Sequence, residues 1–261
     1  MIISNSITIF LLLIIILSIV LYGNTLDESF ISNLELKIVN TYVVNLDKDK
    51  QRMDELTVGL NREKIKFERF SAIYGKDLDL TSPKCDKYFT EKARKELKLG
   101  QMGCSMSHIT IWEKIAKHPV DTDVFMVLED DAIVPNNFHR DLVKYTSELP
   151  YNWDMLLLGA NNLIGKKYSH RLLYTDKSIK KNGNYGTYAY LLKPSSAKKM
   201  LKTCEKMDKT IDHYLNKNFY LKYKVYFCNP HFVTHNYDYE SNLVNRIRTA
   251  DAKRNNQIKI I

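Results

Sequence analysis

The sequence predicts an α/β domain with a mainly parallel sheet, and three observations lead to this fold class. Strand-like apolar segments alternate with segments of helical period, which is the order typical of layered α/β domains. One segment, Val124–Leu128, is apolar throughout, as expected for a strand buried on both faces of a parallel sheet. No internal repeat or low-complexity linker divides the chain after its apolar N-terminus, so we expect one domain there.

The N-terminal segment is predicted to cross a membrane as one helix. No charged residue occurs between Met1 and Thr25, and about 20 apolar residues are enough to span a bilayer. An uncleaved signal-anchor is favoured over a cleaved signal peptide, because the segment lacks a basic n-region and a small-residue cleavage site. The positive-inside rule gives little help, so a single-pass type II protein with a lumenal or extracytoplasmic domain is a hypothesis. The expected parts are an anchor at 1–24, a stem at 25–36, the folded domain at 37–235 and a basic tail at 236–261.

The first elements form a strand–helix–strand unit. Residues 38–46 are rich in β-forming side chains and lead directly into a helix at 47–60, with Asp47 as its N-cap. The apolar stripe of this helix consists of Met53, Leu56 and Leu60. Residues 66–73 alternate like a half-buried strand, so we expect a βαβ unit at the start of the domain.

The later elements continue the alternation of strands and helices. A polar stretch through Pro83 and Cys85 is predicted to be a loop, with a short helix after Thr90. Residues 160–184 show no strong period and are predicted to be a mobile connection. The remaining predicted elements are helices at 100–116, at 137–149, from Pro194 and from Ile211, and strands at 124–128, 153–159, 186–192 and 224–228.

The composition narrows the class of ligand. The net charge of +9 comes mostly from Lys residues scattered among acidic ones, which predicts a solvated surface with some affinity for anionic ligands. No nucleic-acid-binding module is recognisable, so nucleic acid is not an expected partner. The cysteines lack the CxxC spacing of zinc sites, and disulfides and buried free thiols are both compatible with their positions.

Three adjacent carboxylates mark the candidate site. Glu129, Asp130 and Asp131 directly follow an apolar strand, and such strands open at their carboxyl ends onto ligand-binding crevices. Adjacent like charges attract a hard cation, and carboxylate oxygens suit Mg2+ or Mn2+. A solvated turn after the strand is the alternative. The segments described next favour the metal-site interpretation.

The order and separation of several segments resemble glycosyltransferase family 25, which includes lipopolysaccharide-type and collagen hydroxylysine galactosyltransferases. These segments are 42–47 (YVVNLD) followed by Arg52, 100–108 (GQMGCSMSH), 128–131 (LEDD), 153–159 (WDMLLLG) and 186–190 (GTYAY) leading to Asp212. The resemblance implies a single glycosyltransferase type A domain with a Rossmann-like fold at 37–235. It also implies a metal-dependent enzyme that uses a UDP-sugar as donor.

The resemblance implies specific roles for the acidic triplet. In the first-and-third pattern of this fold, Glu129 and Asp131 would hold Mn2+ or Mg2+, which would stabilise the departing diphosphate. Asp130 would contact the ribose or the sugar of the donor. A late histidine completes the metal site in many type A enzymes, and His235 is the candidate by analogy.

Further donor contacts are implied near the first and third predicted helices. Val44 and Asn45 would meet the base and the ribose, and Arg52 would lie near the phosphates. Ser107 and His108 would reach the donor from the helix at 100–116. The structural alternatives are a helix cap for Asn45, an exposed helical position for Arg52 and a packed, hydrogen-bonded side chain for His108.

The resemblance implies inversion at the anomeric carbon, which requires a general base for the acceptor hydroxyl. Asp212 is the first candidate and Asp154 the second; their alternatives are a helix N-cap and a structural role. Gly186 and Thr187 would line the acceptor side. The tyrosines of the strand at 186–192 are predicted to fill the core rather than to stack on a sugar.

The leading interpretation is an inverting hexosyltransferase that moves galactose or glucose from a UDP-sugar to a hydroxyl of a glycan or of a hydroxylysine-containing protein. The alternative is a catalytically inactive sugar-nucleotide- or glycan-binding protein on the same fold, against which the intact acidic triplet and Asp212 argue.

Overall fold

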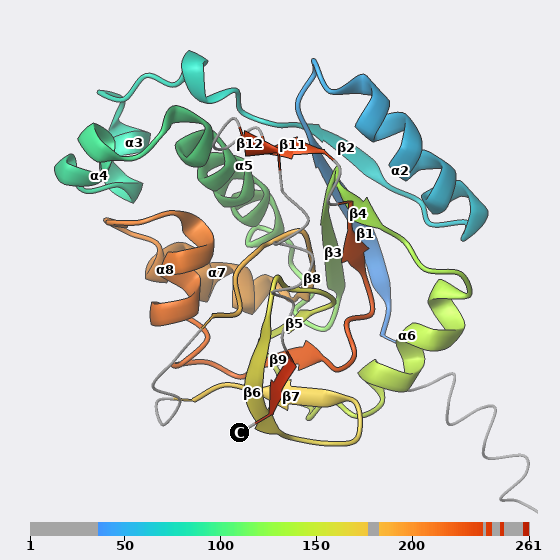
Figure 1. Ribbon diagram of the computed structural model, residues 1–261. Coiled ribbons are helices and arrows are strands. Elements are labelled where there is room, and N and C mark those ends of the chain that lie inside the picture. The colour runs from blue at the N-terminus through green and yellow to red at the C-terminus, as the bar shows by residue number, and fades with distance from the viewer. Residues whose placement is uncertain (1–35, 177–182, 237–238, 242–245, 248–257, 261) are drawn as a thin grey trace, which may run out of the picture. The chain divides into compact units, whose positions relative to one another are not determined.

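The structure is a computed structural model that describes residues 36–176, 183–236, 239–241, 246–247 and 258–260 (Figure 1). The chain divides after Leu36, and Lys37–Ile261 form one compact unit. The predicted anchor at 1–24 and the predicted stem, apart from Leu36, lie outside the described residues. Among the residues that are described, no helix is both long and apolar enough to cross a membrane.

A nine-stranded sheet forms the centre of this unit. In chain order its strands are β1 (Ile38–Asn45), β2 (Glu68–Ser71), β3 (Val124–Glu129), β5 (Met155–Leu157), β6 (Leu163–Lys167), β7 (Leu172–Tyr174), β8 (Ala189–Leu192), β9 (Val225–Cys228) and β13 (Ile258–Ile260). Their spatial order is β13-β6-β7-β9-β5-β8-β3-β1-β2. Only β7 and β8 run against the other strands, so the predicted mainly parallel sheet is confirmed.

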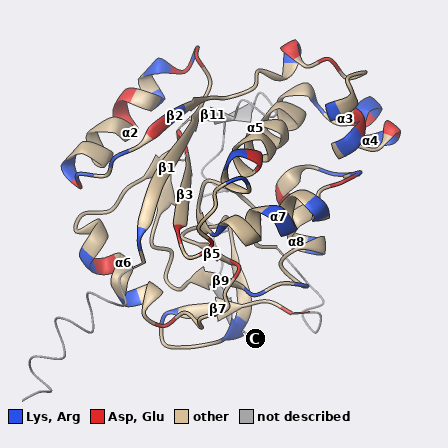
Figure 2. Cartoon of the chain, turned by 180° about the vertical axis from the view of Figure 1, so that it is seen from behind, with Lys and Arg blue, Asp and Glu red and all other residues tan. Residues whose placement is uncertain are grey.

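Helices cover both faces of the sheet (Figures 1 and 2). The face with α5 (Leu99–Ile115) also carries α7 (Pro194–Thr203) and α8 (Ile211–Asn218), whereas α2 (Lys50–Arg62) and α6 (Phe138–Thr146) cover the other face. Two short helices, α3 (Pro83–Tyr88) and α4 (Glu91–Glu96), precede α5. This arrangement is the layered α/β architecture that the sequence predicts.

The register of β1 and β3 decides where the candidate site lies. These strands are parallel neighbours, and Val44 is paired with Glu129. Their carboxyl ends therefore meet at one edge of the sheet. The chain after β3 turns into β4 (Ala132–Ile133), which pairs with β10 (Thr234–His235) at the same edge. Two more short strands, β11 (Glu240–Ser241) and β12 (Arg246–Ile247), pair with each other.

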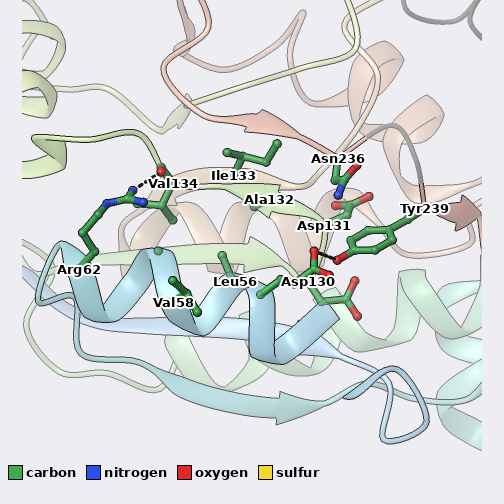
Figure 3. A pocket seen from close by; sticks show the side chains of 12 residues that line it. Leu56, Val58, Arg62, Asp130, Asp131, Ala132, Ile133, Val134, Asn236 and Tyr239 are labelled. Carbon is green, nitrogen blue, oxygen red and sulfur yellow. Dashed lines mark hydrogen bonds between the residues drawn. The ribbon is translucent and has the colours of Figure 1, made fainter. Parts of the chain in front are cut away.

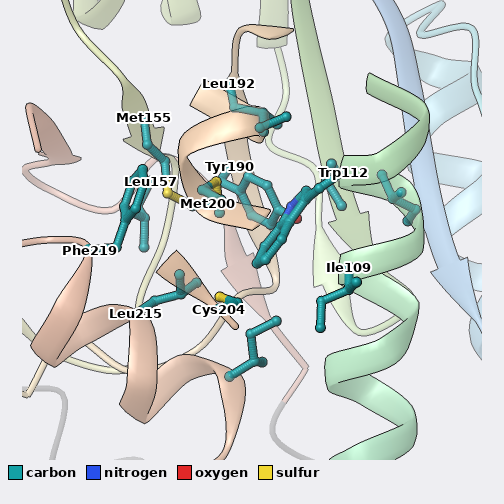
Figure 4. Packing of buried hydrophobic residues seen from close by; sticks show 14 of the residues in the cluster. Ile109, Trp112, Met155, Leu157, Tyr190, Leu192, Met200, Cys204, Leu215 and Phe219 are labelled. Carbon is teal, nitrogen blue, oxygen red and sulfur yellow. The ribbon is translucent and has the colours of Figure 1, made fainter. Parts of the chain in front are cut away.

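The core between α5 and the sheet is mostly aromatic and aliphatic (Figure 4). Trp112 of α5 and Tyr190 of β8 are both fully buried, which confirms the prediction that Tyr190 fills the core. Gly103 lets α5 approach the chain after β2 closely, because a Cβ atom there would lie 2.5 Å from the Ile73 carbonyl oxygen. Neighbouring helices contribute Met200, Cys204, Leu215 and Phe219 to this core.

Removing a core side chain should cost much of the stability. Leu215 is fully buried in α8. We expect Leu215→Ala to lower the free energy of unfolding by about 2–5 kcal/mol, because the substitution loses apolar burial and leaves a cavity. Urea denaturation followed by circular dichroism measures this change. Val58→Ala is the control, since Val58 is 68% exposed, and an equal loss in both variants would contradict the packing described.

Several sequence predictions are corrected. Asp47 is not the N-cap of the first helix: α2 begins at Lys50 with Asp49 as its N-cap, and Asp47 accepts hydrogen bonds from Arg69 and Ser71. The loop predicted around Pro83 is helix α3, which Ser82 caps by accepting from the Cys85 amide. Of the two alternatives left open for the cysteines, the structure shows free thiols at all four positions. The connection predicted at 160–184 contains β6 and β7, whose leucines are buried.

Candidate active site

The first group of the site surrounds Asp130, directly after β3. Asn45 Nδ2 donates to Asp130 Oδ2 at 2.8 Å, and Arg52 Nη1 approaches Asp130 Oδ1 at 3.4 Å. Arg69 Nε donates to Asn45 Oδ1 at 2.8 Å and so fixes the orientation of the amide. Burial raises the pKa of Asp130, although the hydrogen bond from Asn45 and the charge of Arg52 oppose this rise. The structure thus brings together three of the residues predicted to contact the donor.

The alternatives for two of these residues are decided by their environment. The Arg52 side chain is only 14% exposed, so the alternative of an exposed helical arginine is wrong. Asn45 also donates to the Asp49 carbonyl oxygen, so it combines a structural contact at the start of α2 with its contact to Asp130. Val44 is buried beside them, and its carbonyl oxygen accepts from the Asp130 amide.

The second group surrounds Glu129, the last residue of β3. Thr187 Oγ1 donates to Glu129 Oε1 at 2.7 Å, and His108 Nε2 lies 3.2 Å from the same oxygen. Gly186, which precedes Thr187, adopts a positive φ of 95°, a conformation that glycine adopts without strain. His108, a predicted donor residue, and Thr187, a predicted acceptor residue, therefore contact the same carboxylate oxygen of Glu129, a predicted metal ligand.

Ser107 and His108 lie deeper than the sequence predicts for donor contacts. Both are fully buried. Ser107 Oγ accepts from the Ile73 amide and donates to the Gly103 carbonyl oxygen, each at 2.8 Å, and so ties α5 to the chain after β2. His108 is packed and hydrogen-bonded, as its structural alternative states. A direct donor contact by either residue stays a prediction.

Asp212 lies in the first turn of α8. Its Oδ1 accepts from Thr210 Oγ1 at 2.7 Å and from the His213 amide at 2.8 Å. The N-cap position is Thr210, so the N-cap alternative for Asp212 is wrong. Burial raises the pKa of Asp212, but the hydrogen bonds from His213 and Thr210 outweigh burial and lower it below its usual value. Asp212 is therefore a carboxylate at neutral pH.

The charges of Asp212 and of the acidic triplet all raise the pKa of one thiol, that of Cys104. Burial raises the pKa of Cys104 in α5, and negative charges raise it further. In order of effect, these charges belong to Glu129, Asp212, Asp131 and Asp130. Electrostatic interactions weaken with distance, so these four carboxylates are close enough to Cys104 to affect its pKa.

Two predicted residues remain: His235 lies at the edge of the sheet where β3 ends, and Asp154 lies at the opposite edge. His235 is paired with Ala132 next to Asp131, and the Asn236 amide donates to the Asp131 carbonyl oxygen at 2.7 Å. Asp154 precedes β5, which runs parallel to β3, so it lies at the opposite edge from Glu129. There it accepts from Lys199 Nζ at 2.6 Å. The structure does not bring Asp154 together with the other candidates.

Comparison with known proteins decides the family. The profile described as glycosyltransferase family 25 (LPS biosynthesis protein) matches residues 38–215, which is more than half of the chain. The chain belongs to glycosyltransferase family 25. The family predicted from the sequence is therefore confirmed.

Curated relatives of this family 25 chain are much longer proteins. A procollagen lysyl hydroxylase and glycosyltransferase of Acanthamoeba polyphaga mimivirus is 28% identical over 177 residues, which are 63% of this chain and 19% of the relative. Procollagen galactosyltransferase 2 of Mus musculus is 21% identical over 169 residues, which are 61% of this chain and 27% of the relative. The matched part thus spans about a fifth to a quarter of these relatives.

Solved structures resemble this family 25 domain only distantly. A glycosyltransferase involved in the glycosylation of the major capsid of PBCV-1 has a TM-score of 0.33 and 10% identity, covering 63% of this chain and 65% of the other. A Drosophila galactosyltransferase 7 in complex with manganese, UDP-Gal and xylobiose has a TM-score of 0.31 and 10% identity, covering 62% and 51%. These likenesses are too distant to assign details of this site.

The oxygen ligands of the family 25 site fit a hard divalent cation. Glu129 and Asp131 offer carboxylates at the edge where β1 and β3 end, and such ligands suit Mn2+ or Mg2+. A second group was not predicted from the sequence. The ligand atoms of Cys104, His108 and Glu129 lie within 4.8 Å of one another. The only sequence signal for this group is the helical spacing of Cys104 and His108.

A cavity of about 270 Å³ adjoins the acidic triplet (Figure 3). It lies between α2 and β4, with Asp130 and Asp131 at one end and Arg62 at the other. Tyr239 closes the acidic end: its ring lies 4.6 Å from the Arg52 guanidinium, and its hydroxyl donates to Glu55. A ligand in this cavity would reach two of the three carboxylates. The contribution of Tyr239 was not predicted, because the sequence of the tail has no recognisable pattern.

Proposed function

We propose that this chain is an inverting, metal-dependent hexosyltransferase that uses a UDP-sugar, with galactose or glucose as the transferred sugar. The acceptor is a hydroxyl of a glycan or of a hydroxylysine-containing protein. One observation supports this most strongly: within a family 25 domain, Asn45 and Arg52 contact Asp130 where β1 and β3 end, directly beside Glu129 and Asp131. Thr187, the residue predicted on the acceptor side, donates to Glu129 at the same place.

Donor binding in this proposal uses the edge where β1 and β3 end. Asp130, oriented by Asn45 and Arg52, accepts hydrogen bonds from the ribose or the sugar. The charge of Arg52 also attracts the diphosphate. Val44, Ser107 and His108 are buried, and in this proposal they contribute to the donor side.

Glu129 and Asp131 would hold Mn2+ or Mg2+ in this proposal, with His235 as a third ligand. A divalent cation at this position supplies positive charge against the departing diphosphate. Thr187 and His108 fix one oxygen of Glu129, which keeps the carboxylate oriented toward the edge of the sheet.

Asp212 serves as the general base. The acceptor oxygen forms a bond to the anomeric carbon, the bond from this carbon to the diphosphate oxygen breaks, and UDP leaves with the electron pair. The proton of the acceptor hydroxyl passes to Asp212. Because hydrogen bonds lower the pKa of Asp212, the base is ionised over the whole neutral range.

UDP release tests this function. We expect the full chain to release UDP from UDP-galactose or UDP-glucose in the presence of Mn2+, and much less after chelation of the metal. A hydroxylysine-containing collagen peptide and a glycan acceptor distinguish the two acceptor classes. Binding of the donor without UDP release, with or without either acceptor, would instead support the inactive sugar-nucleotide-binding protein.

We also propose that 1–24 anchors the chain as a signal-anchor and that the domain faces the lumen or the extracytoplasmic side. The support is the uncharged apolar sequence from Met1 to Thr25. Added protease should leave residues 37–261 intact in sealed microsomes and digest them after detergent treatment. Digestion without detergent would contradict the orientation.

A further inference from the structure

A line of hydrogen bonds connects the core to the acidic triplet. Trp112 Nε1 donates to the Tyr190 hydroxyl oxygen at 2.8 Å, and this oxygen lies 2.9 Å from His108 Nδ1. His108 Nε2 lies 3.2 Å from Glu129 Oε1. Trp112, Tyr190 and His108 are all fully buried; Figure 4 shows Trp112 and Tyr190 within the core. The line therefore runs from the centre of the domain to the end of β3 without solvent contact at these three side chains.

The donors and acceptors along this line determine the position of each proton. The Trp112 indole can only donate, so its N–H points at the Tyr190 oxygen. Burial raises the pKa of Tyr190, so the hydroxyl keeps its own proton. Within the described part of the chain, the remaining hydrogen-bond neighbour of this hydroxyl is His108 Nδ1. Nδ1 must accept that proton, because a buried hydroxyl without an acceptor is unfavourable.

The tautomer of His108 follows from this assignment. Its Nδ1 carries no proton, and the neutral ring carries its proton on Nε2. Nε2–H is therefore a donor to Glu129 Oε1, next to the donor Thr187. A protonated Nε2 cannot ligate a metal ion, so this geometry opposes a metal site formed by Cys104, His108 and Glu129.

We infer that Tyr190 and His108 are positioning residues that fix one imidazole tautomer and thereby hold the Glu129 carboxylate in place for the cation. This inference rests on the proposed function, in which Glu129 is a metal ligand. The hydroxyl of Tyr190 acts through His108 and touches neither donor nor acceptor. Its loss should leave the donor pocket intact but weaken the orientation of Glu129.

The tautomer can be observed directly. In the full chain labelled with 15N-histidine, we expect an NMR signal pair for His108 with Nε2 protonated and Nδ1 unprotonated. His108→Gln identifies this pair by its disappearance. Tyr190→Phe should weaken the preference for this tautomer, since Nδ1 loses its donor while Nε2–H keeps Glu129 as its acceptor. A protonated Nδ1 in the wild type would overturn the inference, whether or not the chain transfers sugar.

The binding of Mn2+ in the presence of UDP provides the second test. We expect Tyr190→Phe to raise the Kd of Mn2+ by about 3- to 10-fold, which corresponds to the loss of about one hydrogen bond. Tyr220→Phe is a matched control: Tyr220 is fully buried in the same core, and its hydroxyl has no hydrogen-bond partner among the described residues. Equal Kd values for the two variants would overturn the inference.

Substitutions of His108 separate positioning from metal ligation. Glutamine can accept from Tyr190 and donate to Glu129, so His108→Gln should retain more Mn2+ affinity than His108→Leu. A larger loss of affinity in Cys104→Ala than in Tyr190→Phe would instead assign the cation to the thiol group and overturn the inference. A wild-type chain could show the expected tautomer and yet transfer no sugar with Mn2+. This result would contradict the proposed function and leave the tautomer assignment intact.

Discussion

Asp131→Asn should nearly abolish metal-dependent transfer. Asp131 is 9% exposed, and asparagine keeps its size while removing its charge. Loss of a carboxylate ligand weakens cation binding, and even partners that only orient a ligand contribute about 10- to 100-fold to metal affinity. We therefore expect a loss of at least about 100-fold in kcat/KM at fixed Mn2+, with partial recovery at high Mn2+ concentrations.

The control for this variant is Asp141→Asn. Asp141 lies on α6, and its carboxylate pairs with Arg140 and Lys144 at the surface. Surface ion pairs contribute little to stability, so this variant should transfer sugar like the wild type. Full activity in Asp131→Asn, with the same Mn2+ dependence as the wild type, would contradict the role of Asp131.

Asp212→Asn should remove the general base and leave donor binding intact. The amide oxygen can still accept from Thr210 and from the His213 amide, so α8 should keep its conformation. General base catalysis contributes about 10²- to 10⁴-fold, and we expect kcat for transfer to fall by that factor. The Kd values of UDP and Mn2+ should change by less than about 3-fold, because in the proposed function Asp212 contacts the acceptor and not the donor.

Asp208→Asn provides the matched control for Asp212→Asn, because Asp208 is exposed on the loop that leads into α8. Radiolabelled sugar transfer and isothermal titration separate catalysis from binding in the two variants. Unchanged kcat in Asp212→Asn would show that another group takes the acceptor proton.

The proximity of Asn45, Arg52 and Asp130 could be predicted from the sequence because it follows a simple rule of parallel sheets. Asn45 ends β1 and Asp130 directly follows β3, and carboxyl ends of neighbouring parallel strands meet at one edge. Arg52 lies in the first turn of α2, where its guanidinium reaches Asp130. Local pattern was sufficient here because each side chain lies at the end of its own strand or at the start of its own helix, although Asn45 and Asp130 are 85 residues apart in the sequence.

The contacts of His108 could not be predicted in this way. They depend on β8, which lies antiparallel between β3 and β5 and brings Tyr190 and Thr187 beside α5 and Glu129. The position of β8 in the strand order depends on pairing across the whole sheet, so a local sequence pattern does not predict it. The error at Asp47 has a more local cause: Asp49 is an equally good N-cap, and only the position of β2 gives Asp47 its partner Arg69.

A crystal structure of the full chain with Mn2+ and UDP tests the central claim most directly. We predict anomalous density for one manganese ion in contact with the carboxylate oxygens of Glu129 and Asp131, with the diphosphate on its other side. The carboxylate of Asp212 should face the space next to the diphosphate. Manganese bound at Cys104 and His108, or UDP bound away from the edge where β1 and β3 end, would contradict this account.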